Sequence, residues 1–147
     1  LTADGIVGAR TEKALKITLT GKSSLSKNTV SSANLDLLAK CVYAEARGEP
    51  YVGQVAVAAV VLNRVKSASF PNTIAGVIYQ PWAFTAVNDG QINLSPNATA
   101  IKAAKDALNG WDPTNGCLYY YNPSTATSKW IWSRTVMLSI GKHNFAK

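Results

Sequence analysis

Histidine and cysteine are scarce in this chain, which has His143 as its only histidine and Cys41 and Cys117 as its only cysteines. A structural zinc site usually needs four such ligands and a catalytic one commonly needs three, so the usual histidine-rich zinc amidases and peptidases are nearly excluded. Glycine-rich phosphate-binding loops are absent as well, and we expect neither a cofactor nor a bound metal. The two cysteines have no CxxC spacing, which favours small buried apolar side chains over a disulfide.

Long apolar runs are also missing. The longest, residues 55–62, is far shorter than the roughly 18 residues that a membrane-spanning helix needs. The chain begins at Leu1 without an initiator methionine or a charged leader, so we expect a trimmed or mature fragment whose export signal lies upstream. Its 147 residues, 47% of them apolar, suffice for one globular domain with a core.

Acidic residues are few, with 8 Asp and Glu against 15 Lys and Arg, which gives a net charge of +7. A basic excess favours an anionic partner such as nucleic acid, an acidic polysaccharide or a membrane surface. The basic residues are spread along the chain without a Lys/Arg run or an RNA-binding signature. We therefore expect no nucleic-acid partner.

The composition changes along the chain and predicts three parts. Residues 1–20 contain the pattern D-G-x-x-G-x-x-T-x-x-A-L, which resembles the C-terminal end of the common peptidoglycan-binding repeat. Residues 21–33 are rich in Ser, Thr and Lys and lack apolar periodicity, as a linker does. Residues 34–147 are expected to form the main domain.

The main domain is predicted to be α+β, with helices first and a small antiparallel sheet toward the C-terminus. Asn34 is expected to cap the first helix, and Ser95 followed by Pro96 is expected to start the last one. The helices expected are 34–46, 53–66, 71–79 and 96–108, and the strands expected are 118–121, 130–133 and 136–140.

Glu45 is the first candidate for chemistry. It falls at the end of the first predicted helix, one turn after Cys41 and beside the apolar stripe. A carboxyl held against apolar walls can keep its proton near neutral pH, which a general acid requires. The spacing alone leaves open a solvated surface glutamate paired with Arg47 or Lys40.

The residues around Glu45 form a longer pattern. Residues 44–65 read A-E-A-R-G-E-P-x-x-G-Q-x-A-V-A-x-V-x-x-N-R-V, which closely resembles the SleB/CwlJ family of cell-wall hydrolases, the spore cortex-lytic hydrolases. The resemblance extends over about residues 34–147, and the motif in residues 1–20 indicates the SleB branch. Its further marks are Phe70-Pro71, Ile74, Val77-Ile78, Phe84, Asp89-Gly90, Tyr121-Asn122-Pro123 and I-G-K-H-x-F at 140–145.

The resemblance implies a mainly helical, lysozyme-like domain that cleaves the glycan of spore cortex peptidoglycan during germination. It implies a lytic transglycosylase that acts between N-acetylmuramic acid and N-acetylglucosamine on cortex bearing muramic-δ-lactam, with Glu45 as the acid/base. We expect export to the cortex, inner-membrane and coat region of the spore, and a monomer. Cortex peptidoglycan is the expected partner, and a regulatory protein of the spore is a second.

The inventory of acids fits that mechanism. Ordinary glycosidases use two carboxylates, whereas a lytic transglycosylase needs one, because the muramoyl 6-hydroxyl serves as the nucleophile. Glu49 is the competing acid, although its place between Gly48 and Pro50 favours a loop residue bound to Arg47 or to backbone amides. Asp89 is expected to form a turn.

Substrate contacts are expected from polar and aromatic residues within the motifs. Exposed aromatic rings can stack on sugar faces, and amides and hydroxyls can bind acetamido and hydroxyl groups. The residues chosen are Gln54, Phe84, Thr85, Tyr121 and Asn122.

Three other functions stay open. A peptidase could pair Cys117 with His143, although Cys117 does not lie at a helix N-terminus, where its thiolate would be stabilised. A wall-binding module could hold peptidoglycan without cutting it. Within the enzymes, plain hydrolysis by a muramidase or glucosaminidase is the third.

Overall fold

A computed structural model describes residues 32–81 and 83–147. The predicted peptidoglycan-binding remnant, residues 1–20, lies outside the described residues, and so does the predicted linker up to residue 31. Ser32 and Ala33, the last two residues assigned to that linker, are already helical.

Two helices form the centre of the helical part. Helix α2 spans Ser32–Ala46 and α3 spans Tyr51–Lys66. Both were predicted, but Asn34 lies inside α2 and is not its N-cap, because the helix already includes Ser32. Pro50 is the N-cap of α3, and its φ of −54° is the angle that the proline ring imposes.

Shorter helices follow. They are α4 (Ile74–Ile78), α5 (Thr85–Asn88), the 3₁₀-helix η1 (Gln91–Asn93) and α6 (Ala98–Leu108). The predicted cap of α6 was wrong: Asn97 is the N-cap, and its side chain accepts a hydrogen bond of 2.8 Å from the Ala100 amide. Ser95 and Pro96 precede the helix. A short helix was predicted at α4, whereas α5 was not predicted.

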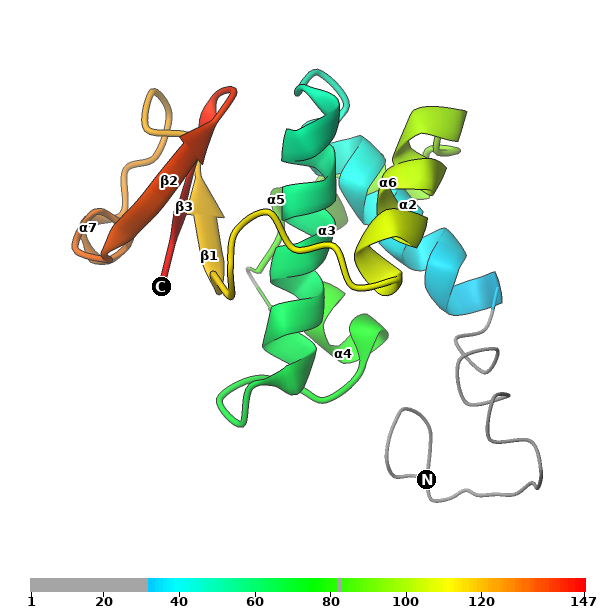
Figure 1. Ribbon diagram of the computed structural model, residues 1–147, viewed down its shortest axis with the longest axis horizontal. Helices are drawn as coiled ribbons and strands as arrows, with labels where there is room; N and C mark the ends of the chain where they lie inside the picture. Colours follow the sequence, from blue (N-terminus) through cyan, green and yellow to red (C-terminus); the bar gives the residue numbers. More distant parts are fainter. Residues whose placement is uncertain (1–31, 82) are drawn as a thin grey trace.

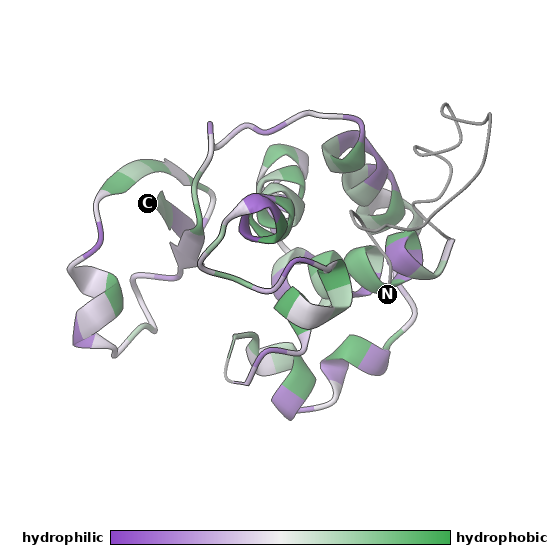
Figure 2. Cartoon of the chain, turned by 90° about the horizontal axis from the view of Figure 1, so that it is seen from below, coloured by the Kyte–Doolittle hydropathy of each residue, from purple (hydrophilic) through white to green (hydrophobic). Residues whose placement is uncertain are grey.

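Helix α3 is buried on almost every side. Residues 53–61 are all buried, which explains the continuous apolar run that begins at residue 55. Figure 2 looks along α3, with α2 and α6 on one side and the sheet on the other, and Figure 1 shows the same order. Helices α2 and α6 pack against α3 through Leu38, Val42, Ala100 and Ala104.

The sheet has three antiparallel strands in the order β1-β3-β2. They are β1 (Tyr119–Tyr121), β2 (Val136–Ile140) and β3 (His143–Ala146). The central strand, β3, was not predicted. The strand predicted at 130–133 was wrong, because Lys129–Trp132 form the short helix α7, whose N-cap Ser128 accepts a hydrogen bond of 3.3 Å from the Ile131 amide.

The sheet packs on α3 through one face. Phe145 of β3 is completely buried and lies in a cluster with Cys117, Ala56, Val57 and Val60. In the register of the sheet, Phe145 pairs with Tyr120 of β1. Tyr120 therefore belongs to the face that meets the helices.

The β2–β3 turn is fixed to the corner between α2 and α3. The Lys142 amide donates a hydrogen bond of 2.8 Å to Glu49 Oε1. Gly141 has a φ of +58°, and a Cβ built on it would overlap Glu49 Oε1 and lie 2.9 Å from Pro50 Cδ. A glycine is therefore required there both by the backbone angle and by the close approach of Glu49.

A second glycine, Gly90, separates the energetic effect of the close approach at Gly141 from that of its backbone angle. Gly90 also has a positive φ, of +82°, but a Cβ there would have nothing within 4 Å. We expect Gly90→Ala to cost about 1–2 kcal/mol of unfolding free energy through backbone strain. Gly141→Ala should cost about 1–3 kcal/mol more, because the new methyl group displaces Glu49. Denaturant unfolding of both variants measures the difference, and equal losses would contradict this account of the turn.

Candidate functional site

Glu45 lies where the helical part meets the sheet. It occupies the last turn of α2 and is half-buried. Its Oε1 accepts a hydrogen bond of 2.5 Å from the Tyr120 hydroxyl on β1, and its Oε2 accepts one of 3.3 Å from the Ala86 amide on α5. Three elements far apart in sequence, α2, α5 and β1, thus meet at one carboxyl. We call the place formed by Glu45, Ala86 and Tyr120 the seam.

Tyr120 is enclosed by other rings. The ring centroids of His143, Phe145 and Phe84 lie 5.0, 6.0 and 6.3 Å from that of Tyr120. Burial, followed by the neighbouring negative charge of Glu45, raises the pKa of the Tyr120 hydroxyl well above its usual value. The phenol therefore keeps its proton and acts as a donor to Glu45.

Arg64 of α3 fastens β1 beside the seam. Its Nε donates a hydrogen bond of 2.7 Å to the carbonyl oxygen of Leu118, the residue before the strand. Its guanidinium group lies 5.0–5.4 Å from the ring centroids of Phe70, Phe84 and Tyr119. Only 8% of Arg64 is exposed, so this cation has a packing role.

The other carboxyls of the described residues have structural partners. Glu49, whose side chain is only 8% exposed, accepts from the Lys142 amide, as the expectation of backbone partners anticipated. Asp89 forms the expected turn, with Oδ1 3.1 Å from the Gln91 amide. The remaining pairs are Asp36 with Lys40, Asp106 with Tyr51 and Lys102, and Asp112 with Asn63, Thr114 and Gly116.

Three of the predicted substrate residues, Gln54, Phe84 and Tyr121, are buried. Gln54 is 5% exposed, and its Nε2 donates a hydrogen bond of 3.2 Å to the Glu49 carbonyl oxygen. Phe84 is 3% exposed and lies between Tyr120 and Arg64. Phe84 thus packs beside the seam, Gln54 bonds to the corner between α2 and α3, and both present little surface to a ligand.

Thr85 lies on α5, whereas Tyr121 and Asn122 are consecutive residues at the end of β1. Thr85 is exposed at the start of α5, next to the Ala86 amide that binds Glu45. Tyr121 lies under Trp132, at a centroid distance of 5.2 Å. Asn122 closes the turn after β1, where its Oδ1 accepts a hydrogen bond of 2.8 Å from the Ser124 amide. Of these three, Thr85 lies beside the seam.

Tyr120, His143 and Arg64 were not predicted to lie near Glu45, although His143 was considered as a partner of Cys117. The signal for Tyr120 was available, because successive residues of a strand point to opposite faces and the middle tyrosine of Tyr119–Tyr121 faces away from the other two. The signal for His143 was its place in the I-G-K-H-x-F motif. Both depend on β3, which the sequence pattern did not reveal.

His143 is an uncharged neighbour of the seam. Its Nδ1 lies 3.9 Å from Glu49 Oε1 and has no hydrogen-bond partner among the described residues. Burial lowers the pKa of His143, and this effect outweighs the opposing attraction of Glu49 and Glu45. The contact with Glu49 is therefore not an ion pair at neutral pH.

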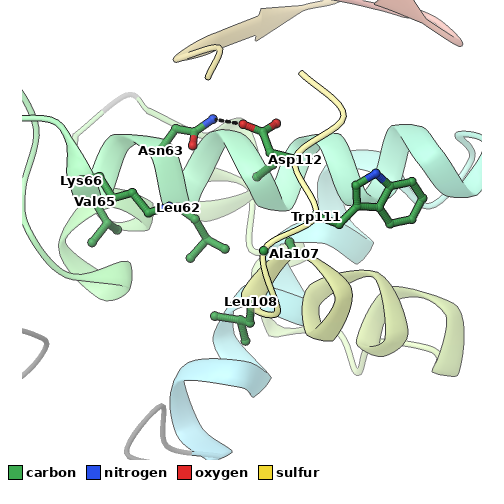
Figure 3. Close-up of a pocket in the computed structure, with 10 residues that line it drawn as sticks. Leu62, Asn63, Val65, Lys66, Ala107, Leu108, Trp111 and Asp112 are labelled. Carbon is green, nitrogen blue, oxygen red and sulfur yellow. Dashed lines mark hydrogen bonds between the residues drawn. The ribbon is translucent and has the colours of Figure 1, made fainter. Parts of the chain in front are cut away.

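A cavity of about 230 Å³ lies elsewhere, between α3, α6 and the loop that follows α6 (Figure 3). Its polar wall is the pair Asn63 and Asp112, joined by a hydrogen bond of 2.9 Å. Asp112 also accepts from the amides of Thr114 and Gly116 at 2.8 Å, so its carboxylate serves the loop. The cavity offers no comparable acid for chemistry within the part of the chain described.

Cysteine chemistry and metal binding gain no support from the described residues. Cys41 and Cys117 are both free and completely buried, as predicted. Burial raises the pKa of both thiols, and the Cys117 thiol donates to the Thr114 carbonyl oxygen, which opposes a Cys117–His143 peptidase. Within residues 32–81 and 83–147, no three His, Cys, Asp or Glu side chains are grouped so that they could hold a metal ion.

Comparison with known families places the chain. A family model described as "Cell Wall Hydrolase" matches residues 48–146. The chain belongs to this family. None of the helices in the described part of this cell wall hydrolase is both long enough and apolar enough to span a bilayer. The matched segment begins three residues after Glu45.

Curated relatives carry two names. A spore cortex-lytic enzyme of Bacillus cereus is 52% identical over all of this chain and 68% of its own length. One of Bacillus subtilis is 61% identical over 80% of this chain, but that match covers only 38% of the relative. The cell wall hydrolase CwlJ of Bacillus subtilis is 35% identical over 63% of this chain and 70% of the relative. The family member described here is thus more similar to these cortex-lytic enzymes than to CwlJ.

Two solved structures share the fold. The crystal structure of the catalytic domain of the Bacillus cereus SleB protein is 67% identical, with a TM-score of 0.76 over 80% of this chain and 91% of that one. The catalytic domain of the germination-specific lytic transglycosylase SleB from Bacillus anthracis is 66% identical, with a TM-score of 0.77 over 80% and 96%. The predicted α+β, lysozyme-like fold is confirmed.

The lone histidine allows a direct measurement. Because His143 is the only histidine, its imidazole signal in a proton NMR titration needs no assignment. We expect a pKa below the ordinary value of 6.5, since burial opposes the charged form. Folding stability should then fall as the pH drops below about 6.5, because the unfolded chain binds the proton more readily. A pKa above 6.5 would mean that Glu49 holds His143 as a cation.

The hydrogen bond to Glu45 can be removed without removing the ring. Tyr120→Phe keeps the packing against Phe84, His143 and Phe145 but leaves the Glu45 Oε1 without its donor. We expect the rate of cell-wall digestion to fall about ten- to hundredfold, the range for a hydrogen bond to a charged group. Tyr121→Phe is the matched control, because its hydroxyl only accepts a long bond of 3.4 Å from Asn144. Equal effects of the two variants would refute a special role for Tyr120.

Proposed function

We propose that this cell wall hydrolase cleaves the glycan strands of spore cortex peptidoglycan during germination, as a lytic transglycosylase. The bond broken joins N-acetylmuramic acid to N-acetylglucosamine in strands bearing muramic-δ-lactam. The names of the relatives support the substrate, since those of Bacillus cereus and Bacillus subtilis are spore cortex-lytic enzymes. The name of the Bacillus anthracis structure supports the reaction type.

Glu45 performs the proton transfers in this proposal. Its carboxyl gives a proton to the glycosidic oxygen while the bond from that oxygen to the muramoyl anomeric carbon breaks. The resulting carboxylate then takes the proton of the muramoyl 6-hydroxyl, whose oxygen attacks the anomeric carbon and closes a 1,6-anhydro ring. Glu45 ends protonated, and no water is consumed. The products together have the mass of the substrate.

The observation that carries the proposal is the placement of a single carboxyl at the seam. Tyr120 and the Ala86 amide orient its two oxygens, and Phe84 packs against Tyr120. Such fixed donors hold the group in one geometry before substrate arrives. The other acids of the described residues are engaged in turns and ion pairs.

Plain hydrolysis is the second candidate. An inverting or retaining hydrolase requires a second carboxylate to activate water or to attack the sugar. The candidates for that role are Glu49 and Asp89, and both already accept backbone hydrogen bonds, from Lys142 and Gln91 respectively. Their engagement favours a reaction in which the substrate supplies the nucleophile.

Location and partners follow from the proposed substrate. The enzyme would act in the spore cortex, outside the cytoplasm, where peptidoglycan is the partner. The motif of residues 1–20 supports an additional peptidoglycan-binding module upstream of the catalytic domain, joined to it by the segment 21–33. We propose a monomer, and a regulatory protein of the spore as a further partner.

Two matched substitutions test the role of Glu45. Glu45→Gln and Glu49→Gln remove the same charge only four residues apart, and the amide oxygen introduced by Glu49→Gln can still accept from the Lys142 amide. Digests of purified cortex peptidoglycan are analysed by mass spectrometry. We expect anhydro-muramic ends, about one water lighter than reducing ends, with the unmodified chain, and a loss of about a hundredfold or more with Glu45→Gln. Glu49→Gln should retain most of the activity.

Each alternative predicts a different digest. Reducing ends would show that the reaction is hydrolysis and not transglycosylation. Glu49 and Asp89 would then be tested as the second carboxylate. Unchanged cleavage with Glu45→Gln would overturn the assignment of the acid. An absence of cleavage by the unmodified chain, with binding retained, would favour a non-catalytic wall-binding module.

A further inference from the structure

Two exposed tryptophans lie on the side of the sheet that faces away from the helices. Trp130 and Trp132 of α7 are 53% and 48% exposed. Figure 1 shows the sheet between α7 and α3, and Figure 2 shows the same order. Each tryptophan contacts a tyrosine of β1 edge-on: Trp130 and Tyr119 at 5.0 Å and 81°, Trp132 and Tyr121 at 5.2 Å and 64°. We call these four residues, together with Arg134, the outer aromatic face.

The rings of the outer aromatic face are held in place. The Arg134 guanidinium lies 5.2 Å from the centroid of Tyr119 and 5.3 Å from that of Trp130, and its Nε donates to the Lys147 carbonyl oxygen at 3.0 Å. The indole N–H of Trp132 donates to the Ala126 carbonyl oxygen at 3.0 Å. Exposed aromatic rings that are already oriented lose little conformational entropy when a ligand binds.

The C-terminal segment that carries the outer aromatic face has charge of one sign. Residues 113–147 contain Lys129, Arg134, Lys142 and Lys147 and no Asp or Glu, a net charge of +4 from four cations and no anion. Lys129 and Arg134 belong to this face or adjoin it. A positively charged segment attracts anionic polymers and repels cationic ones. The ligand that fits must therefore combine flat apolar faces with negative charge.

We propose that the outer aromatic face is a second peptidoglycan-binding surface, distinct from the seam, which takes a glycan strand through its sugar rings and the carboxylates of its peptide side chains. The C–H faces of the sugars stack on the indole rings, and the free carboxylates of the peptide side chains meet Lys129 and Arg134. The proposal rests on the proposed function for the identity of the polymer.

The two surfaces share strand β1. Tyr120 points to the seam, whereas Tyr119 and Tyr121 contact the tryptophans. The ring of Tyr119 also lies 5.4 Å from the Arg64 guanidinium, at the edge where the strand meets the helical part. Attachment at two places raises the local concentration of an insoluble polymer at the seam without changing the chemistry there. The second surface should therefore matter for insoluble peptidoglycan and not for short soluble fragments.

The test separates binding from cleavage. The full chain carrying Glu45→Gln is sedimented with insoluble cortex peptidoglycan, with and without Trp130→Ala and Trp132→Ala together. We expect the double change to weaken binding about tenfold, as at aromatic hot spots. Trp111→Ala is the matched control, because Trp111 is 43% exposed on the helical part, beside Tyr51, and should change binding less than about twofold. With Glu45 intact, the double variant should cleave short soluble glycan fragments within about twofold of the normal rate.

A second variant guards against loss of folding. Lys129→Glu changes an exposed cation and leaves both indole rings in place, and it should weaken binding about threefold or more at low salt. Unchanged sedimentation of both variants, or an equal loss with Trp111→Ala, would overturn the proposal. The proposal would also be overturned if the two tryptophans were needed for binding to anionic phospholipid vesicles but not for binding to peptidoglycan. The unmodified chain could produce no anhydro ends while Trp130→Ala and Trp132→Ala together still weaken binding. That result would refute the proposed transglycosylase activity but support the second binding surface.

Discussion

The hydrogen bond from the Tyr120 hydroxyl to the Glu45 carboxylate is the contact on which the rest of the structure converges. Helix α3 supplies a buried apolar rod that both the helices and the sheet can pack against. Arg64 fixes the start of β1, and Glu49 fixes the β2–β3 turn. These contacts place a donor on a small sheet within reach of an acid at a helix end. Neither part of the molecule alone contains the site.

The sequence predicted the helices better than the strands, for a physical reason. Helices α2 and α3 depend on local periodicity and on the break at Pro50, all of which is visible in the sequence. Strand β3 depends on pairing with partners about twenty residues upstream and just before it, and its residues show little alternation of their own. The run Trp-Ile-Trp at 130–132 consists of residues that favour strands, but it forms helix α7, whose N-cap is Ser128.

The site was predicted in part. Motif resemblance selected Glu45, which the structure places half-buried between the Tyr120 hydroxyl and the Ala86 amide, three residues before the segment that the family model matches. Its role as the acid is part of the proposal. The same resemblance selected Gln54, Phe84 and Tyr121, which are buried, because a motif marks packing residues as well as reactive ones. Tyr121 was predicted as a substrate residue, whereas the neighbouring Tyr120 is the one that donates a hydrogen bond to Glu45. A shift of one residue along a strand exchanges its faces, and the strand's register depends on the undetected β3.

The strand order β1-β3-β2 also governs when the site can exist during synthesis. The strand that carries Tyr120 has its backbone partner in β3, which follows it by more than twenty residues and comes after α7 and β2. A growing chain therefore contains Glu45 long before it can position the donor beside it. The polypeptide reaches its working geometry only when His143–Ala146 have left the ribosome, so an unfinished wall-cutting enzyme lacks the assembled seam.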